Sequence, residues 1–204
     1  MPVLKLVGTQ TAHLSAVDLE VSAAECVCVT GASGSGKSLL LRAIADLDPH
    51  HGHVYLDEHE QYGVSPQQWR SWVGLLPAES QWWYDDVGAH FASNIESDAF
   101  TSWLATLGFE RDVLSWQVSR LSSGERQRLS LLRLLSYQPK ALLLDEPSAN
   151  LDIENTQKTE SLISSYRLHY RTPVLWVSHD DEQIKRVAAR HFHIEQGQLQ
   201  QVAQ

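Results

Sequence analysis

Short apolar runs alternate with amphipathic stretches along most of the chain, which predicts an α/β domain built on a largely parallel sheet. The apolar runs predict strands at residues 3–7, 16–21, 26–30, 53–56, 72–76, 141–144, 174–177, 191–195 and 198–202. Helical spacing of apolar positions predicts helices at residues 37–46, 101–107, 124–137, 153–168 and 181–189, with a further short helix after Pro66. The last two strands flank Gln196 and Gly197 and predict a terminal hairpin.

Residues 77–120 interrupt this rhythm with a loop-rich and then helical stretch, near which most of the tryptophans lie. Six of the seven tryptophans are Trp69, Trp72, Trp82, Trp83, Trp103 and Trp116. One interpretation is that these rings fill a small lobe that has few aliphatic side chains. The other, which rests on the family resemblance described below, is that Trp82, Trp83 and Tyr84 anchor a partner protein, a role that suits aromatic side chains. The sequence leaves both interpretations open.

The composition is ordinary for a soluble globular protein with one core. The chain has 204 residues, 43% of them hydrophobic and 20% charged, and a formal net charge of −9. Lysines and arginines are scattered, so neither a nucleic-acid partner nor attraction to anionic lipid is expected. No apolar run approaches the ~18 residues that span a membrane, and the N-terminus lacks the pattern of a secretory signal. A cytoplasmic location is therefore expected.

Two groups of potential metal-binding side chains receive a structural interpretation. Cys26 and Cys28 lie two apart on a predicted strand, where they share a face, and a disulfide across that spacing is geometrically poor. We expect two buried, reduced thiols. The histidines of the second group lie in or near a turn far from the motifs below and have no cysteine nearby, so metal binding is not favoured. They are His50, His51, His53 and His59.

The segment GASGSGKS, residues 31–38, fits the phosphate-binding pattern G-x-x-x-x-G-K-[ST]. Its glycines allow backbone N–H groups to approach a phosphate, Lys37 reaches the terminal phosphates as a catalytic cation, and the Ser38 hydroxyl ligates Mg²⁺. A strand precedes this loop and a helix follows it, as such a site requires. The predicted nucleotide-binding residues here are Gly31, Ala32, Ser33, Gly34, Ser35, Gly36, Lys37, Ser38 and Leu39.

Acidic and imidazole side chains end two further apolar strands. Asp145 and Glu146 follow the aliphatic run at residues 142–144, and His179 follows the run at residues 174–177. Strand ends of this kind meet at the ligand-binding edge of an α/β sheet. We expect Asp145 to bind Mg²⁺ through water, Glu146 to act as the general base on the attacking water, and His179 to hydrogen-bond the γ-phosphate.

The segment LSSGE, residues 121–125, is a second phosphate-like motif without a lysine. Its residues Ser122, Ser123 and Gly124 open a predicted helix and offer hydroxyls, N–H groups and a positive dipole end. Together with GASGSGKS, ALLLDEPSANLD and VSHD, in this order along the chain, it resembles the ATP-binding cassette (ABC) ATPase family. Stretches around residues 130–152 and 173–188 look like small bacterial cassettes that work with iron- or metal-exporting permeases.

The resemblance implies one ABC ATPase domain over residues 1–204. Residues 1–77 and 121–204 would form a RecA-like α/β core with antiparallel β elements, and residues 78–120 a small helical lobe. It implies ATP and Mg²⁺ as ligands and a head-to-tail dimer with a second copy, in which LSSGE reaches the nucleotide of the other chain. The residues expected at that interface are Ser122, Ser123, Gly124, Glu125 and Asp152.

The resemblance also implies a separately encoded membrane permease, beneath which the chain would lie on the inner face of the cell membrane. Two rival functions are a non-transport ABC ATPase that regulates a membrane complex and a soluble ABC ATPase of DNA repair or translation. Families of the latter kind carry a coiled-coil insert, zinc modules or paired cassettes, together with a basic surface, and this sequence has none of these features.

The sequence departs from the family pattern at several positions. Ser123 replaces a commoner glycine and Glu125 a commoner glutamine, which are mild changes. A glutamine that links Mg²⁺ to the partner contact is replaced by Ala78, so that water, Glu79 or Gln81 must fill its position, and we expect water. The aromatic ring that usually stacks on adenine is also missing: no Phe, Trp or Tyr precedes residue 55, and residue 13, a histidine, is the nearest ring.

Overall fold

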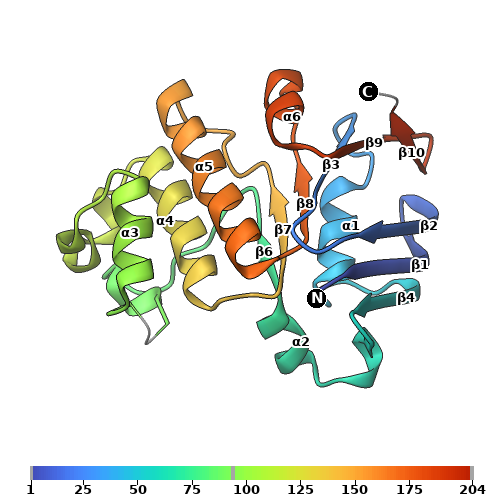
Figure 1. Ribbon diagram of the computed structural model, residues 1–204, viewed down its shortest axis with the longest axis horizontal. Helices are drawn as coiled ribbons and strands as arrows, with labels where there is room; N and C mark the ends of the chain where they lie inside the picture. The colour runs from blue at the N-terminus through green and yellow to red at the C-terminus, as the bar shows by residue number, and fades with distance from the viewer. Residues whose placement is uncertain (1, 93–94, 203–204) are drawn as a thin grey trace.

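The computed structural model describes residues 2–92 and 95–202. Figure 1 shows two sheets with helices between and beside them. In chain order the main elements are β1 (Leu4–Thr11), β2 (Leu14–Val21), β3 (Cys26–Gly31), α1 (Lys37–Ile44), β4 (His51–Leu56), β5 (His59–Glu60), α2 (Pro66–Trp72), β6 (Val73–Leu76), α3 (Asp98–Thr106), α4 (Ser123–Ser136), β7 (Ala141–Asp145), α5 (Ile153–Tyr170), β8 (Val174–Val177), α6 (Asp181–Val187), β9 (Arg190–Glu195) and β10 (Gln198–Val202). Short 3-10 helices lie at Gln61–Gly63, Gly88–His90, Arg111–Ser115 and Val118–Arg120.

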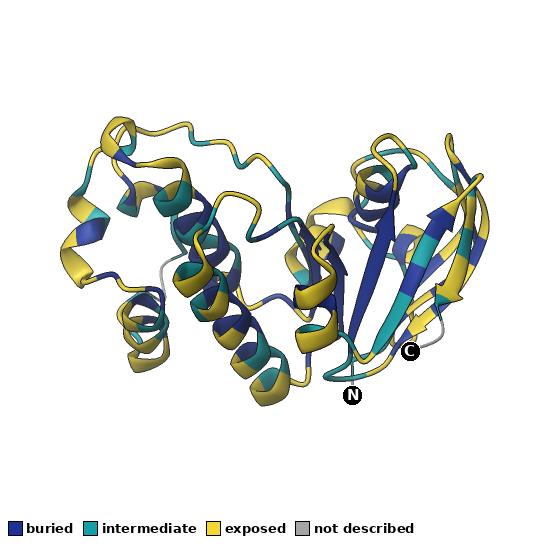
Figure 2. Ribbon diagram, turned by 90° about the horizontal axis from the view of Figure 1, so that it is seen from above, coloured by how far each residue is buried: buried dark blue, intermediate teal, exposed yellow. Residues whose placement is uncertain are grey.

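The larger sheet has six strands in the order β10-β9-β3-β8-β7-β6, and every pair except β9 with β10 is parallel. Its strands β3, β7 and β8 are buried at every position, as continuous apolar runs require when helices cover both faces. Figure 2 shows these strands buried between the flanking elements. The smaller sheet has four antiparallel strands in the order β2-β1-β4-β5.

Two apolar clusters occupy opposite faces of the larger sheet. Alternate residues of β7 enter different clusters: Leu143 packs with α1 and the smaller sheet, whereas Leu142 and Leu144 pack with α4 and α5. The second cluster continues without a break into residues 87–121, through side chains such as Phe100 and Val113. The helices α1 and α4 therefore lie on opposite faces of one sheet (Figure 1).

The structure confirms the predicted α/β core with antiparallel elements and the terminal hairpin of β9 and β10. The first two strands are longer than predicted and form a hairpin, because β1 continues to Thr11 and β2 already begins at Leu14. The strand β5 was missed, since two residues give no readable alternation. The division into a core and a lobe at residues 78–120 stays a prediction, and residues 93–94 of that lobe lie outside the described residues.

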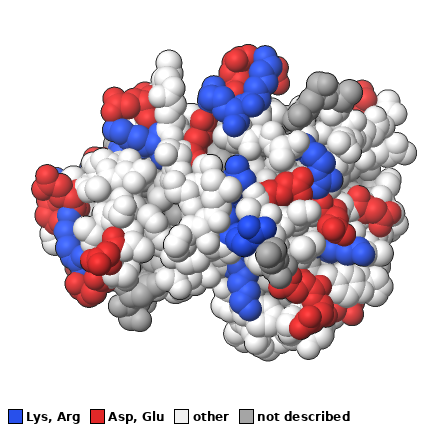
Figure 3. Space-filling view, viewed as in Figure 1, with Lys and Arg blue, Asp and Glu red and all other residues white. Residues whose placement is uncertain are grey.

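Two further features concern the charged surface and the length of the helices. Figure 3 shows acidic and basic side chains interspersed over the face viewed there. Among the described residues, no helix combines the length and apolar character needed to cross a membrane.

Candidate functional site

Three neighbouring parallel strands bring the predicted chemistry to one edge of the larger sheet. In register, Val29 of β3 and Asp145 of β7 both pair with Val177 of β8. The glycine loop follows β3, Glu146 follows β7, and His179 lies just beyond β8. We call residues 31–38, 145–146 and 178–179 the strand-end site, because ligands of α/β proteins bind at this edge.

The glycine loop turns tightly into α1. Gly31, Gly34 and Gly36 have φ angles of 150°, 77° and 103°, a region that side chains disfavour. A Cβ on Gly31 would lie 2.7 Å from Ser35 Oγ, so a larger residue at this position would clash with the loop. No side chain among the described residues caps α1 at this end. The first N–H groups of that helix therefore remain available to an anion.

The Lys37 ammonium lies inside the loop that precedes it. It is only 7% exposed and donates to the carbonyl oxygens of Gly31 and Ala32, at 2.7 and 2.9 Å. Burial lowers the pKa of Lys37, while the carboxylates of Glu146 and Asp145 act in the opposite direction. The cation is thus held between the loop and the acidic end of β7.

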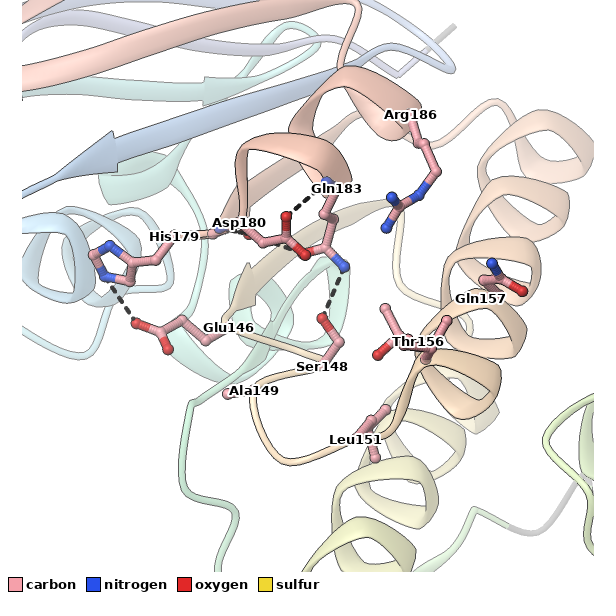
Figure 4. Close-up of a pocket in the computed structure, with 12 residues that line it drawn as sticks. Glu146, Ser148, Ala149, Leu151, Thr156, Gln157, His179, Asp180, Gln183 and Arg186 are labelled. Carbon is pink, nitrogen blue, oxygen red and sulfur yellow. Dashed lines mark hydrogen bonds and ion pairs between the residues drawn. The ribbon is translucent and has the colours of Figure 1, made fainter.

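The acidic pair leaves the sheet through a sharp turn. Asp145 ends β7 and is buried, and Glu146 adopts a φ of 49° with its backbone N–H donating to Val177 O at 3.0 Å. His179 Nε2 then lies 3.1 Å from Glu146 Oε1 (Figure 4). Both side chains line an open pocket of about 590 Å³ that also contains Ser148. A carboxylate and an imidazole thus meet in a space that water can enter.

Residues 122–125 form the N-terminus of α4 through a capping box. The Ser122 Oγ accepts a hydrogen bond from Glu125 N at 3.2 Å, and the Glu125 carboxylate accepts from Ser122 N and Oγ, both at 2.8 Å. The two hydrogen bonds that the carboxylate accepts, led by the one from the Ser122 backbone, lower the pKa of Glu125. A carboxylate fits this third helical position as well as an amide does, which accounts for the departure found in the sequence.

The N-terminus of α4 lies beside the loop that connects β7 to α5. A Cβ on Gly124 would lie 3.3 Å from the Leu151 side chain and 3.4 Å from Asn150 O. In that loop Asp152 caps α5, and its carboxylate accepts from the backbone and the side chain of Asn155, at 2.8 and 2.9 Å. Within one chain, the two predicted phosphate-binding motifs therefore belong to helices on opposite faces of the sheet.

Ala78 lines an open pocket of about 350 Å³, together with the exposed side chains of Glu79 and Gln81. Gln127 of α4 lines the same pocket and is buried, and its Nε2 lies 3.5 Å from Glu146 O. No motif in the sequence includes Gln127. It approaches the end of β7 from α4, whereas the expected glutamine would have come from position 78.

Three aromatic rings, two of them exposed, surround a buried histidine in residues 82–91, which we call the aromatic segment. His90 Nε2 accepts from the backbone N–H groups of Trp83 and Tyr84, at 3.0 and 2.9 Å, so Nδ1 carries the proton and donates to Asp86 O at 3.0 Å. The rings of Trp82, Trp83 and Tyr84 all lie within 5.1 Å of the His90 ring. Trp83 is 64% exposed and Tyr84 is 55% exposed.

The tryptophans divide between the core and the surface. Trp69 is fully buried, as core packing requires, and Trp82 is half-buried with the Arg133 guanidinium 4.7 Å from its ring centre. Trp83 instead presents most of its ring to solvent. An exposed aromatic side chain held by a buried hydrogen-bonding group suits an anchor for a partner.

The cysteines are buried and free, as the sequence predicts, and two histidines of the second group contact neighbouring side chains. Cys26 and Cys28 are free and buried, and a hydrogen bond from the Cys28 thiol to Cys26, together with burial, raises the pKa of Cys28. His53 contacts the Glu60 carboxylate and His50 stacks on a tyrosine ring. In the part of the chain that the structure describes, no three histidine, cysteine or acidic side chains are grouped as a metal site.

The strand-end site fits ATP and Mg²⁺ by the chemistry of its groups. Ser35 Oγ is buried in the glycine loop and finds no hydrogen-bond partner among the described residues, so its O–H is free to donate to a phosphate held by the loop. The Ser38 hydroxyl on the first turn of α1 and the Asp145 carboxylate supply the hard oxygen ligands that Mg²⁺ prefers.

Comparison with known proteins shows which family the chain resembles. The sequence model of the family described as ABC transporter matches residues 14–149. The Fe(3+) ions import ATP-binding protein FbpC of Streptomyces avermitilis is 36% identical over 200 residues, and the match covers 93% of this chain and 57% of the relative. The probable iron export ATP-binding protein FetA of Escherichia coli is 31% identical, and the match covers 84% of this chain and 80% of the relative.

One further relative and one solved structure are also similar to this chain. The aliphatic sulfonates import ATP-binding protein SsuB 3 of Pseudomonas syringae pv. tomato is 34% identical, and the match covers 96% of this chain and 72% of the relative. A bacterial Atm1-family ABC exporter, solved with ATP bound, superposes with a TM-score of 0.85 over 97% of this chain and 38% of the exporter chain. Its sequence identity is 21%, so this likeness concerns the fold.

Proposed function

The chain belongs to the ABC transporter family, as the motifs predict, and we propose on that premise that it hydrolyses ATP to drive a separately encoded membrane permease. The observation that carries the proposal is the convergence of the glycine loop, Asp145 with Glu146, and His179 at one sheet edge. Phosphoryl transfer needs mainly positioning and charge neutralisation, and these groups supply both.

Each group receives a distinct task. The backbone N–H groups of residues 31–39 hold the phosphates, and Lys37 exchanges its carbonyl partners for the β- and γ-phosphate oxygens. Ser38 and, through water, Asp145 would hold Mg²⁺, which would neutralise the phosphate charge when bound. Glu146 orients and deprotonates the attacking water, while His179, already 3.1 Å from Glu146, hydrogen-bonds the γ-phosphate.

A second copy of the chain completes the site in this proposal. The motif at residues 122–125 offers helix N–H groups and a serine hydroxyl, yet its helix lies on the sheet face opposite to α1 of the same chain. A head-to-tail dimer would place this motif and Asp152 against the ATP of the other copy. ATP would then close the dimer, and hydrolysis would reopen it.

The permease would contact the aromatic segment. Trp83 and Tyr84 are the exposed rings there, and aromatic side chains serve well as interface anchors. The chain would therefore lie at the cytoplasmic face of the membrane through its partner. The relatives are named for iron import, iron export and sulfonate import, so substrate and direction do not follow from the likeness.

Phosphate release from Mg-ATP tests the proposed activity. Glu146→Gln should retain ATP binding by calorimetry and slow hydrolysis by about 10²–10⁴-fold, because the amide cannot accept the proton. Glu58→Gln changes an exposed carboxylate in the turn between β4 and β5 and serves as the matched control. A Glu146→Gln variant that hydrolyses ATP as fast as the control would contradict the role of Glu146.

A further inference from the structure

One buried amide joins the two loops that carry the proposed catalytic side chains. Gln183 lies in the first turn of α6 and is only 2% exposed. Its Nε2 donates to Ser148 Oγ at 2.8 Å and to Glu160 Oε1 at 2.9 Å, and its Oε1 accepts from Ser178 Oγ at 2.8 Å. Figure 4 shows Gln183 reaching toward Ser148 across the pocket.

The orientation of this amide follows from its neighbours. A carboxylate only accepts hydrogen bonds, so the amide nitrogen must face Glu160 and the amide oxygen must face Ser178. Arg186 holds the Glu160 carboxylate in place through two hydrogen bonds, at 2.7 and 3.0 Å. Both N–H groups of the Gln183 amide and its oxygen are thus used in a single arrangement.

The two serines lie beside the residues that carry the chemistry. Ser148 lies two residues after Glu146, in the loop that leads to Asp152, and Ser178 directly precedes His179. Ser178 Oγ also accepts from Asp180 N at 3.1 Å, which ties down the backbone on the other side of His179. A displacement of the loop after Glu146 would therefore be passed through Gln183 to the His179 segment.

We propose that Gln183 is a positioning residue for ATP hydrolysis. Its amide fixes the position of the 146–152 loop relative to the 178–180 segment. Glu146 and His179 can then both contact the same γ-phosphate. In the dimer, contact of the partner with the 146–152 loop then also positions His179. This inference rests on the proposed function and adds a coupling element to it.

Replacement by an apolar side chain tests the coupling. Gln183→Leu keeps most of the volume but removes all three hydrogen bonds, so kcat for ATP should fall about 10- to 100-fold, as loss of catalytic alignment does. KM should change less than about threefold, because the phosphate-binding loop is untouched. Gln157→Leu is the matched control, since Gln157 lines the same pocket from α5 and is exposed. Its kcat should stay within about twofold of wild type.

A charge exchange separates positioning from general stability. Gln183→Glu sets two carboxylates against each other and should also lower kcat at least about tenfold. Adding Glu160→Gln places an amide donor at position 160 opposite the carboxylate acceptor at position 183. The kcat of this double variant should return to within about threefold of wild type. A double variant no more active than Gln183→Glu alone, with the fold intact, would overturn the arrangement proposed for the amide.

Hydrogen exchange without nucleotide provides a readout that does not depend on turnover. Gln183→Leu should raise amide exchange in residues 146–152 and 178–180 together, whereas Gln157→Leu should raise neither. Unchanged exchange in both segments, or an unchanged kcat in folded Gln183→Leu protein, would overturn the inference. A wild-type chain that hydrolyses no ATP would contradict the proposed function itself, whereas an active wild type with an equally active Gln183→Leu variant would contradict only this inference.

Discussion

The strand-end site and the aromatic segment are built in opposite ways. At the strand-end site, each functional side chain lies within a short motif directly after a strand, and the register of β3, β7 and β8 brings the motifs together. In the aromatic segment, Trp83 and Tyr84 depend on His90, and Arg133 of α4 donates to a carbonyl 52 residues earlier, that of Gln81. Chemistry encoded locally can be read from sequence, whereas a surface assembled from distant residues cannot.

The largest expected effect on ATP binding is at the strand-end site. Lys37→Ala removes the one cation inside the glycine loop, and a charge-assisted hydrogen bond contributes about 1.5–3 kcal/mol, so Kd for ATP should rise on the order of 10- to 100-fold. The aromatic segment should be unaffected. Calorimetric titration with Mg-ATP measures the change, with the exposed Lys5→Ala as control. Equal affinity of the two variants would contradict the assignment of Lys37.

His90→Ala should cost stability without touching the phosphate-binding loop. The substitution leaves two backbone N–H groups without their acceptor and opens a cavity under three rings, a loss of about 2–4 kcal/mol. Urea unfolding monitored by tryptophan fluorescence measures it. A loss below about 1 kcal/mol would show that the aromatic segment holds its shape without His90.

Trp83→Ala sharpens the comparison within the aromatic segment. Because the Trp83 ring is 64% exposed, its loss should cost less than about 1 kcal/mol of stability. Association with the co-purified permease should nevertheless weaken on the order of tenfold or more, as at an interface anchor. A variant that unfolds, or that binds the permease as wild type does, would contradict the proposed docking role.

Ala78→Gln tests whether water replaces the missing glutamine side chain at position 78. If water fills the place of the missing amide, adding the side chain should raise ATPase activity by up to about tenfold, through better positioning of the attacking water. Glu79→Ala and Gln81→Ala should change it little, because both side chains are exposed. Steady-state phosphate release measures all three. A large loss in either alanine variant, with ATP binding preserved, would show that its side chain has taken the role.

The smallest effect concerns the capping box of α4. Glu125→Ala should lower stability at pH 7 by about 1 kcal/mol. The folded-state pKa of Glu125 lies below its ordinary 4.5, so this contribution is present above pH 4.5 and is lost as pH falls through the folded-state value. Unfolding curves of the variant and wild type should therefore converge on acidification. A difference that persists unchanged at pH 2 would contradict the role of the carboxylate charge.

The sequence predicted the α/β core and the three strand-end motifs because each depends on a few consecutive residues. The glycine loop needs only its own φ angles, and Asp145 needs only the buried strand before it. The first hairpin and the strand β5 were less well predicted, since their bounds depend on pairing between strands. The fold as a whole was therefore accessible to sequence reasoning, apart from the exact bounds of its elements.

Residues that act through tertiary contacts were missed. Gln127 and Gln183 are buried amides on helices, where the sequence gives only a polar residue at a helical position. Glu160 looks like a surface residue in the middle of α5 until α6 folds over it and supplies Arg186. The sequence offered one signal for Gln183: it lies four residues after His179, close to a motif.

The central claim is that one chain supplies half of each ATP site and a second copy supplies the rest. Sedimentation of Glu146→Gln tests it directly, because slow hydrolysis should trap the closed state. We expect a monomer without nucleotide, a dimer with saturating Mg-ATP, and a monomer again when Lys37→Ala is added. A Glu146→Gln protein that binds ATP with full occupancy yet sediments as a monomer at high protein concentration would contradict the claim.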